Sequence, residues 1–349
     1  MTLDTTKPTG AGRSPAPGFG LQGVLLRPEL TALISTIAVF IVFAVLAGNA
    51  GFLTLIGTRN YLQVAAMIGI VGTPITLLLV AGEFDLSVGT MIGAAGIVVA
   101  YPIVNFGWPL WAAAGLGFGF AALVGAINGT ITVRLSIPSF LVTLGMMFML
   151  RGLGLAVSLI VAGTTQVYGL KAKLLADPLY PLFVGNLFGM PVALYWWIGL
   201  ALLGAHLLSN TRFGNWILAA GGDPDAAAKM GVPVARVKII LYMLTAMSAV
   251  IVAMLNMFYV DMADVAQGLG KEFEGITAAV VGGTAITGGI GSPIGTAIGA
   301  LMFGMISQGF FYTDINDSWF YAIVGGMLLL AVVINTYARK VALLQRGRK

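Results

Sequence analysis

Residues 61–81 read YLQVAAMIGIVGTPITLLLVA and contain no charged side chain. An α-helix rises 1.5 Å per residue, so this stretch would be about 31 Å long, close to the roughly 30 Å thickness of a bilayer's hydrocarbon core. Only helices and closed barrels satisfy every backbone group in hydrocarbon, and the stretch lacks the ten-residue alternation of barrel strands. It therefore predicts a membrane-spanning helix.

Similar apolar stretches recur along the chain and predict an all-α polytopic membrane protein with about ten transmembrane helices. The predicted spans cover 30–48, 61–81, 86–104, 109–131, 139–162, 192–209, 238–259, 273–289, 293–311 and 318–336. They lie in a transmembrane domain over 27–340. Residues 1–26, rich in Pro, Gly, Thr and Ser, are expected to form a disordered cytoplasmic tail, and 341–349 a basic one.

The composition supports this class and excludes several functions. Of 349 residues, 58% are hydrophobic and 9% are charged, against about 25% charged residues in an ordinary soluble domain. The absence of Cys excludes disulfides, thiolate metal sites and a thiol nucleophile, and His206, the single His, cannot form a metal cage. No catalytic motif and no Walker A pattern occurs. We expect no enzyme activity, no bound metal or cofactor and no nucleic-acid partner.

The basic residues predict the orientation. Thirteen of the 18 Lys and Arg residues fall on the side of the two termini, four fall on the opposite side, and Arg151 lies inside a span. The positive-inside rule therefore predicts that both termini are cytoplasmic.

A loop over 210–237, between two spans, carries the sequence Gly-Gly-Asp-Pro-Asp-Ala-Ala-Ala-Lys-Met-Gly from Gly221 to Gly231. Asp223 is a good N-cap and Pro224 suits the first helical position. The alanines favour a helix, Lys229 complements its C-terminus, and Gly231 can end it in the left-handed conformation. The pattern predicts a short, well-capped cytoplasmic helix over 223–230. A capped loop helix without a function remains the alternative.

Two Gly-rich breaks interrupt the apolar pattern, at 82–89 and 288–293, and lead into similar strings. Residues 89–94 read GTMIGA and residues 295–300 read GTAIGA. Paired interruptions in the two halves of a chain point to a transporter with inverted repeats, so the strings predict an internal inverted repeat with broken helices. In the Gly-rich run 282–295 we expect the glycines to be backbone contacts and not phosphate ligands.

Five motifs carry a resemblance to a known family. The pattern at Gly221, Gly222, Asp223, Ala226, Ala227 and Gly231 resembles the coupling-helix loop of ABC importer permeases. Four further motifs resemble the ribose/xylose/galactose branch of that family: 82–89, Asn128-Gly129, 138–147 with Arg151-Gly152, and 282–295. They follow the family order and cover roughly residues 60–336. The sequence departs from the branch at Glu83, where a second Gly is more usual.

The resemblance implies a subunit of an importer in the bacterial inner membrane, surrounded by lipid. Two such chains, as a homodimer, would form the pore. Separate ATPase subunits carrying ATP and magnesium would bind the coupling helices, and an extracytoplasmic binding protein would deliver the substrate. The residues expected to couple to the ATPase are Gly221, Gly222, Asp223, Pro224, Ala226, Ala227, Lys229 and Gly231. The substrate class it implies is a monosaccharide or small polyol, and sugar alcohols, inositol and nucleosides stay open.

Polar residues in and beside the spans are candidates for a translocation pathway. They are Glu83, Asp85, Ser87, Asn128, Ser139, Phe140, Thr143 and Asn256. Two carboxylates at the end of an apolar span are costly unless they are hydrated, protonated or paired, and Arg151 is a candidate partner. Both readings of Glu83 and Asp85 stay open: hydrated groups near the head groups, with Asp85 capping the following span through Ser87, or a buried pair. A rival function is an ion-coupled secondary transporter that uses Glu83, Asp85 and Arg151 as a proton relay.

Overall fold

The computed structural model describes residues 28–313 and seven isolated helical positions between 319 and 333. The predicted tails at 1–26 and 341–349, and most of the predicted span 318–336, lie outside these residues.

Eight of the described helices are long and apolar enough to cross a bilayer, which confirms the prediction of an all-α polytopic membrane protein. They are α2 (Pro28–Ala47), α3 (Leu55–Val80), α4 (Val88–Phe106), α5 (Leu110–Arg134), α6 (Ser139–Ala162), α8 (Val192–Asn210), α11 (Val234–Val260) and α13 (Pro293–Phe311). A short π-helix, η1 (Gly48–Phe52), extends α2. The bounds of α6 and α13 agree with the predicted spans residue for residue.

The predicted span 273–289 is wrong as a continuous helix. Only α12 (Lys271–Val281) is helical, and residues 282–292 form a non-helical stretch before α13 begins. Gly283, Gly288 and Gly289 adopt positive φ angles of 95°, 82° and 78°, which favour glycine. Gly283 lies two residues after the end of α12, and the other two lie in the following non-helical stretch. This part of the chain is a half-helix followed by a turn-rich segment.

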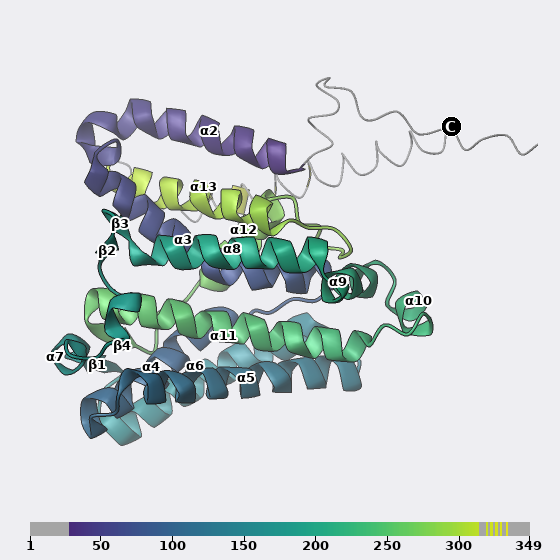
Figure 1. The fold of residues 1–349 in the computed structure, drawn as a ribbon, viewed down its shortest axis with the longest axis horizontal. Helices are drawn as coiled ribbons and strands as arrows, with labels where there is room; N and C mark the ends of the chain where they lie inside the picture. The colour runs from purple at the N-terminus through teal and green to yellow at the C-terminus, as the bar shows by residue number, and fades with distance from the viewer. Residues whose placement is uncertain are drawn as a thin grey trace, which may run out of the picture.

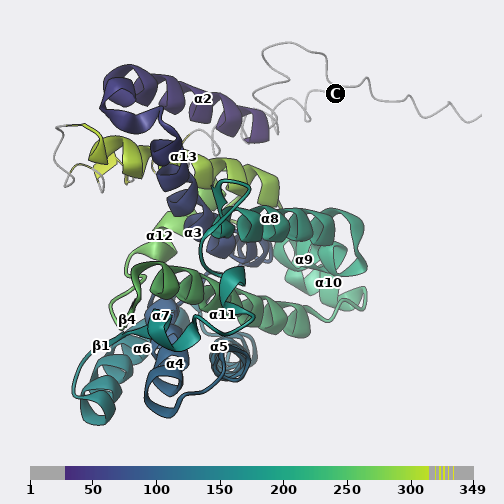
Figure 2. The same cartoon turned by 60° about the vertical axis from the view of Figure 1, so that its left-hand side comes forward.

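The long helices lie side by side in one bundle, and short elements cover its two ends (Figures 1 and 2). At one end lie α9 (Arg212–Gly222) and α10 (Pro224–Lys229), and we call this the α10 end. The opposite, strand end carries α7 (Leu170–Leu174), η2 (Tyr180–Leu182) and two small sheets. In these, β1 (Gln166–Tyr168) pairs with β4 (Met262–Asp264), and β2 (Asn186–Leu187) with β3 (Met190–Pro191).

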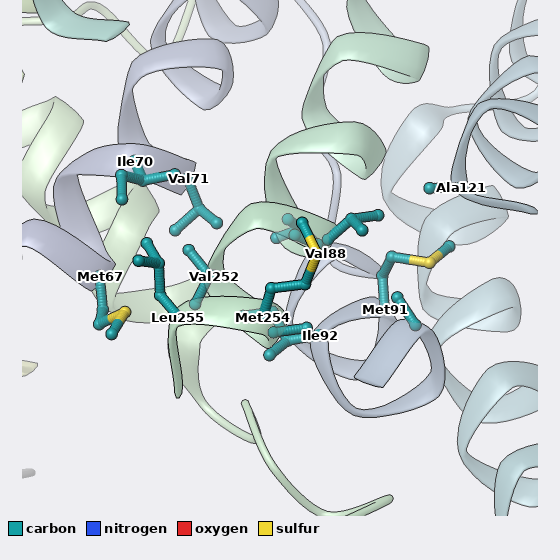
Figure 3. Close-up of a cluster of buried hydrophobic side chains, with 14 of the residues drawn as sticks. Met67, Ile70, Val71, Val88, Met91, Ile92, Ala121, Val252, Met254 and Leu255 are labelled. Atoms are coloured by element: carbon teal, nitrogen blue, oxygen red, sulfur yellow. The ribbon is translucent and has the colours of Figure 1, made fainter. Parts of the chain in front are cut away.

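The core of the bundle is formed by α3, α4 and α11. In α3, 89% of the most apolar stretch is buried, whereas the value is 17% in α6, so α3 is central and α6 peripheral. Met67 and Val71 of α3, Met91 of α4 and Leu255 of α11 lie in one cluster of buried side chains (Figure 3). The break at 81–87 thus joins two of the most buried helices of the bundle, α3 and α4.

Glycines in the two matching strings allow backbones to approach closely. A Cβ atom at Gly93 would lie 2.1 Å from the carbonyl oxygen of Val265, and one at Gly295 would lie 1.9 Å from that of Gly282. Gly299 meets the carbonyl oxygen of Ala278 in the same way, at 2.3 Å. Each string therefore lies at the start of a helix, 89–94 in α4 and 295–300 in α13, and the backbone of another segment packs directly against it. This agrees with the prediction that the glycines in 282–295 are backbone contacts. The inverted repeat itself stays a prediction.

Candidate functional site

The break between α3 and α4, residues 81–87, is held by side chains from α5, α6 and α11. Ser139 of α6 accepts a hydrogen bond from the backbone N–H of Phe84 at 3.1 Å. Tyr242 of α11 donates its hydroxyl to the carbonyl oxygen of Phe84, also at 3.1 Å. The ends of a helix leave backbone N–H and C=O groups without hydrogen-bond partners inside that helix. Ser139 and Tyr242 therefore supply partners for Phe84 that α3 and α4 cannot supply.

Asp85, Ser87 and Asn128 form a buried chain of hydrogen bonds at the start of α4. Oδ1 of Asp85 accepts from the backbone N–H of Ser87 at 2.8 Å and from its hydroxyl at 2.6 Å. Asn128 of α5 donates its amide to the same hydroxyl oxygen at 3.0 Å. The three residues are at most 2% exposed, so the structure brings these predicted pathway residues together and disfavours the hydrated reading of Asp85.

Glu83 pairs with Lys238 and not with Arg151, so the predicted Glu83–Arg151 pair is wrong. The Nζ atom of Lys238, in the first turns of α11, lies 2.5 Å from Oε1 of Glu83. Arg151 lies twelve residues beyond Ser139, about 18 Å further along α6 at 1.5 Å per residue, and its side chain is exposed. The carboxylate is thus neutralised by the nearest basic residue of the central helix.

Several buried polar atoms in and beside this cluster lack a hydrogen-bond partner within the described residues. They are Oδ2 of Asp85, Oδ1 of Asn128 and Oγ1 of Thr132, which lies one helical turn beyond Asn128 on α5. Glu272, in the first turn of α12, is 3% exposed and its Oε2 atom also lacks a partner. Leaving such atoms unpaired costs roughly 1–3 kcal/mol each, more for charged groups, so the cluster can accept hydrogen bonds from a water molecule or a ligand hydroxyl.

The remaining predicted pathway residues differ in their placement. Thr143 is fully buried one turn beyond Ser139, and its hydroxyl donates to the Ser139 carbonyl oxygen at 2.8 Å. Phe140 is 51% exposed on the outer surface of α6. Asn256 lies fourteen residues beyond Tyr242 on α11, about 21 Å along the helix. Phe140 and Asn256 are therefore not part of the cluster.

The capped helix predicted at 223–230 is present as α10. The side chain of Asp223 accepts a hydrogen bond from the backbone N–H of Ala226 at 2.9 Å, and Pro224 occupies the first turn. Lys229 is in the last turn, and Gly231 follows with a φ of 84°. Each predicted capping residue lies where the sequence pattern expects it.

The two faces of α10 differ. Ala227 is 6% exposed because it packs toward the rest of the loop, and its carbonyl oxygen accepts from the N–H of Val232 at 3.0 Å. Ala226 and Lys229 are exposed, and Met230, directly after the helix, is 84% exposed. The face available to a partner therefore contains Met230, and Ala227 has a structural position instead.

Sequence reasoning missed Lys238, Tyr242 and Glu272. Lys238 and Tyr242 are four residues apart and so share one face of α11, where both contact the break at Glu83 and Phe84. A lysine at the very start of an apolar span was the available signal. Glu272 falls between the predicted spans 238–259 and 273–289, but its segment runs back into the bundle, where a Cβ at Gly89 would lie 1.8 Å from its Oε2 atom.

Comparison with known proteins gives consistent matches. The sequence profile of the family described as the permease component of the branched-chain amino acid transport system matches residues 57–332. The fructose import permease protein FrcC of Rhizobium meliloti is 31% identical over 320 residues, which cover 90% of this chain and 87% of that protein. The ribose import permease protein RbsC of Escherichia coli K12 is 29% identical over 308 residues, covering 88% and 93%. The probable ABC transporter permease protein YphD of the same strain is 32% identical over 333 residues, covering 94% and 96%.

Proposed function

Since this chain belongs to the permease family of ABC importers, in the branch of the monosaccharide permeases, we propose that it is the membrane-spanning subunit of an ATP-driven sugar importer. Separate ATPase chains supply the energy, and α9 and α10 receive it. Transport follows an alternating-access cycle in which the two breaks change their arrangement. The chain itself carries out no chemical step.

The observation that carries this proposal is α10 with its exposed end. A six-residue helix of this kind is too short to be stable by itself, so its caps and its contacts to α9 and α11 hold it in place. The 84% exposure of Met230 presents a flexible apolar side chain beside the charged Lys229. An exposed Met at a helix end suits insertion into an apolar groove of an ATPase subunit. This assignment makes the α10 end cytoplasmic, in agreement with the positive-inside count.

The buried polar cluster between α4, α5 and the break is the proposed substrate-facing region. Asp85 and Asn128 offer unpaired acceptor oxygens, and Ser87, Ser139 and Thr143 supply hydroxyls nearby. A sugar or polyol presents several hydroxyl donors, which match acceptors of this kind. Exposure of the cluster to substrate requires the break to shift, as alternating access supposes.

Arg151 supports the presence of a second permease chain. It lies halfway along α6, and its side chain is exposed in the single chain. A charge at the bilayer centre facing lipid costs at least about 2.5–3.5 kcal/mol. We therefore place α6 at the interface of a homodimer, where Arg151 and Phe140 face the partner chain or a water-filled pathway between the two.

The strand end then faces outward and receives a substrate-binding protein. The relatives named above import fructose and ribose, and a monosaccharide is the substrate class proposed here. Sugar alcohols and nucleosides are the alternatives to be compared. Binding measurements with the partner binding protein would identify the substrate.

Co-purification tests the proposal directly. The tagged chain is purified from its native host, and the purified complex is examined for an ATPase chain and for ATP hydrolysis that increases with the loaded binding protein. The proposal expects both. A chain that purifies alone and transports sugar without ATP would contradict it.

The rival proton-relay function loses its main support. The relay required Arg151 beside Glu83 and Asp85, whereas Glu83 pairs with Lys238, and Arg151 lies about 18 Å beyond Ser139 along α6. Oδ1 of Asp85 is hydrogen-bonded to Ser87, so neither carboxylate pairs with Arg151.

A further inference from the structure

Three segments that are far apart in the sequence meet at one point near the α10 end. They are the end of α3 at Val80 and Gly82, the end of α9 at Gly221, and the turn at Gly288 and Gly289 before α13. The backbone N–H of Gly289 donates a hydrogen bond to the carbonyl oxygen of Val80 at 2.8 Å. We call these five residues the glycine junction.

The junction has no room for a side chain at Gly221 or Gly288. A Cβ atom at Gly221 would lie 1.7 Å from the carbonyl oxygen of Val80 and 2.8 Å from the nitrogen of Gly289. A Cβ atom at Gly288 would lie 2.7 Å from the carbonyl oxygen of Gly221 and 3.1 Å from the Cα atom of Gly82. Distances below 3 Å to backbone atoms cannot be relieved by turning a side chain. The segments therefore touch backbone to backbone.

The break between α3 and α4 is also held by residues of α11, the helix that follows α10 in the sequence. Lys238 follows α10 in sequence and pairs with Glu83, and Tyr242 donates to the carbonyl oxygen of Phe84. The break after α3 is thus held by Gly221, which precedes α10, and by Lys238, which follows it. A displacement of α10 would therefore act on this break through Gly221 and through Lys238. It would also act on the turn before α13, through Gly288 and Gly289.

We infer that the glycine junction is the mechanical link through which the α9–α10 loop moves both broken elements of the bundle together. This inference rests on the proposed function, because it assumes that an ATPase moves α10. Direct backbone contact suits this task, since close-packed interiors transmit displacement and contain no flexible side chain that could absorb it. Gly221 is then a positioning residue for transport, and the junction stays closed throughout the cycle.

The test compares two glycines in the complete transporter complex. Gly221→Ala places a methyl group against Val80, whereas at Gly199, exposed on α8 and outside the coupling loop, no heavy atom lies within 4 Å of an added Cβ. Each variant is reconstituted with its ATPase and binding protein. Three quantities are measured: the amount of ATPase subunit that stays bound to the chain, the rate of ATP hydrolysis without binding protein, and the rate of sugar uptake. We expect the uptake per ATPase retained to fall about tenfold in Gly221→Ala relative to Gly199→Ala, which is typical of a lost coupling free energy between two sites. Equal uptake by the two variants would overturn the inference.

Hydrogen exchange of the unmodified complex provides the second measurement, which also decides the case if Gly221→Ala does not accumulate. The amide of Gly289 is followed in nucleotide-free and ATP-trapped complexes. Slow exchange in both states is expected if the junction stays closed. Fast exchange in either state would show that the turn before α13 separates from the end of α3, so that the junction opens, and the inference would be wrong. Failure of the parent complex to bind an ATPase would instead contradict the proposed function.

Discussion

The Nζ atom of Lys238 lies 2.5 Å from Oε1 of Glu83, and this pair joins the central helix α11 to the break after α3. The two side chains are 13% and 12% exposed, so the pair is largely removed from solvent. Breaking a buried pair from one side leaves an unpaired charge and typically costs about 3–5 kcal/mol, whereas replacing both charges costs much less.

Lys238→Met is therefore expected to lower thermal stability in detergent more than the double variant Glu83→Gln/Lys238→Met. Unfolding can be followed by the fluorescence of the six tryptophans. Lys173→Met, on the exposed surface of α7, is the control and should have little effect. Additive effects of Glu83→Gln and Lys238→Met would argue against the pair.

Ser87 connects two buried side chains, and its removal should affect both. Ser87→Ala deletes the hydroxyl that donates to Asp85 and accepts from Asn128. The unsatisfied groups should cost roughly 1–3 kcal/mol of stability, and sugar uptake should fall. Ser248→Ala, which removes a single bond to the Thr245 carbonyl oxygen of its own helix, is the matched control. Equal stability and uptake of the two variants would rule out a special role for Ser87.

Substitutions in and beside α10 should separate docking from folding. Met230→Glu places a charge on an exposed position, so the fold should be unaffected while the amount of ATPase retained on purification falls. Ala227→Trp adds bulk at a buried position and should lower stability by about 1–3 kcal/mol through overpacking. If Met230→Glu retains the ATPase as well as the parent does, Met230 is not the docking residue.

The proposed position of α6 can be tested by cross-linking because the chain contains no Cys. Gly152→Cys introduces a single thiol on α6, next to Arg151, where no heavy atom lies within 4 Å of an added Cβ. Under oxidation in membranes it should give a disulfide-linked dimer. Val45→Cys, 80% exposed on α2, should remain monomeric. Dimers of the α2 variant without dimers of the α6 variant would place the interface elsewhere.

Most of the helices and the capped loop could be predicted from the sequence, because both depend on local patterns. An uncharged stretch of bilayer length defines a span, and Asp223 and Gly231 mark the ends of α10 through interactions within a few residues. The predicted spans at 139–162 and 293–311 match α6 and α13.

The contacts of the charged residues could not be predicted in this way. Glu83 and Lys238 are 155 residues apart, and their pairing depends on how α11 packs against the break. The same limit explains the error at 273–289, where the apolar pattern continues although the helix ends at Val281, two residues before Gly283 with its positive φ. The predicted spans leave Glu272 in a connecting loop, because sequence alone does not show that this loop turns back into the bundle.

The energy source of transport tests the central proposal most directly. Sugar uptake is measured in proteoliposomes that contain the chain with its co-purified ATPase and binding protein, first with ATP inside the enclosed compartment and then with only an imposed proton gradient. The proposal predicts uptake with ATP, loss of that uptake in Met230→Glu, and no uptake driven by the gradient alone. Uptake that follows the proton gradient in the absence of ATP would contradict it.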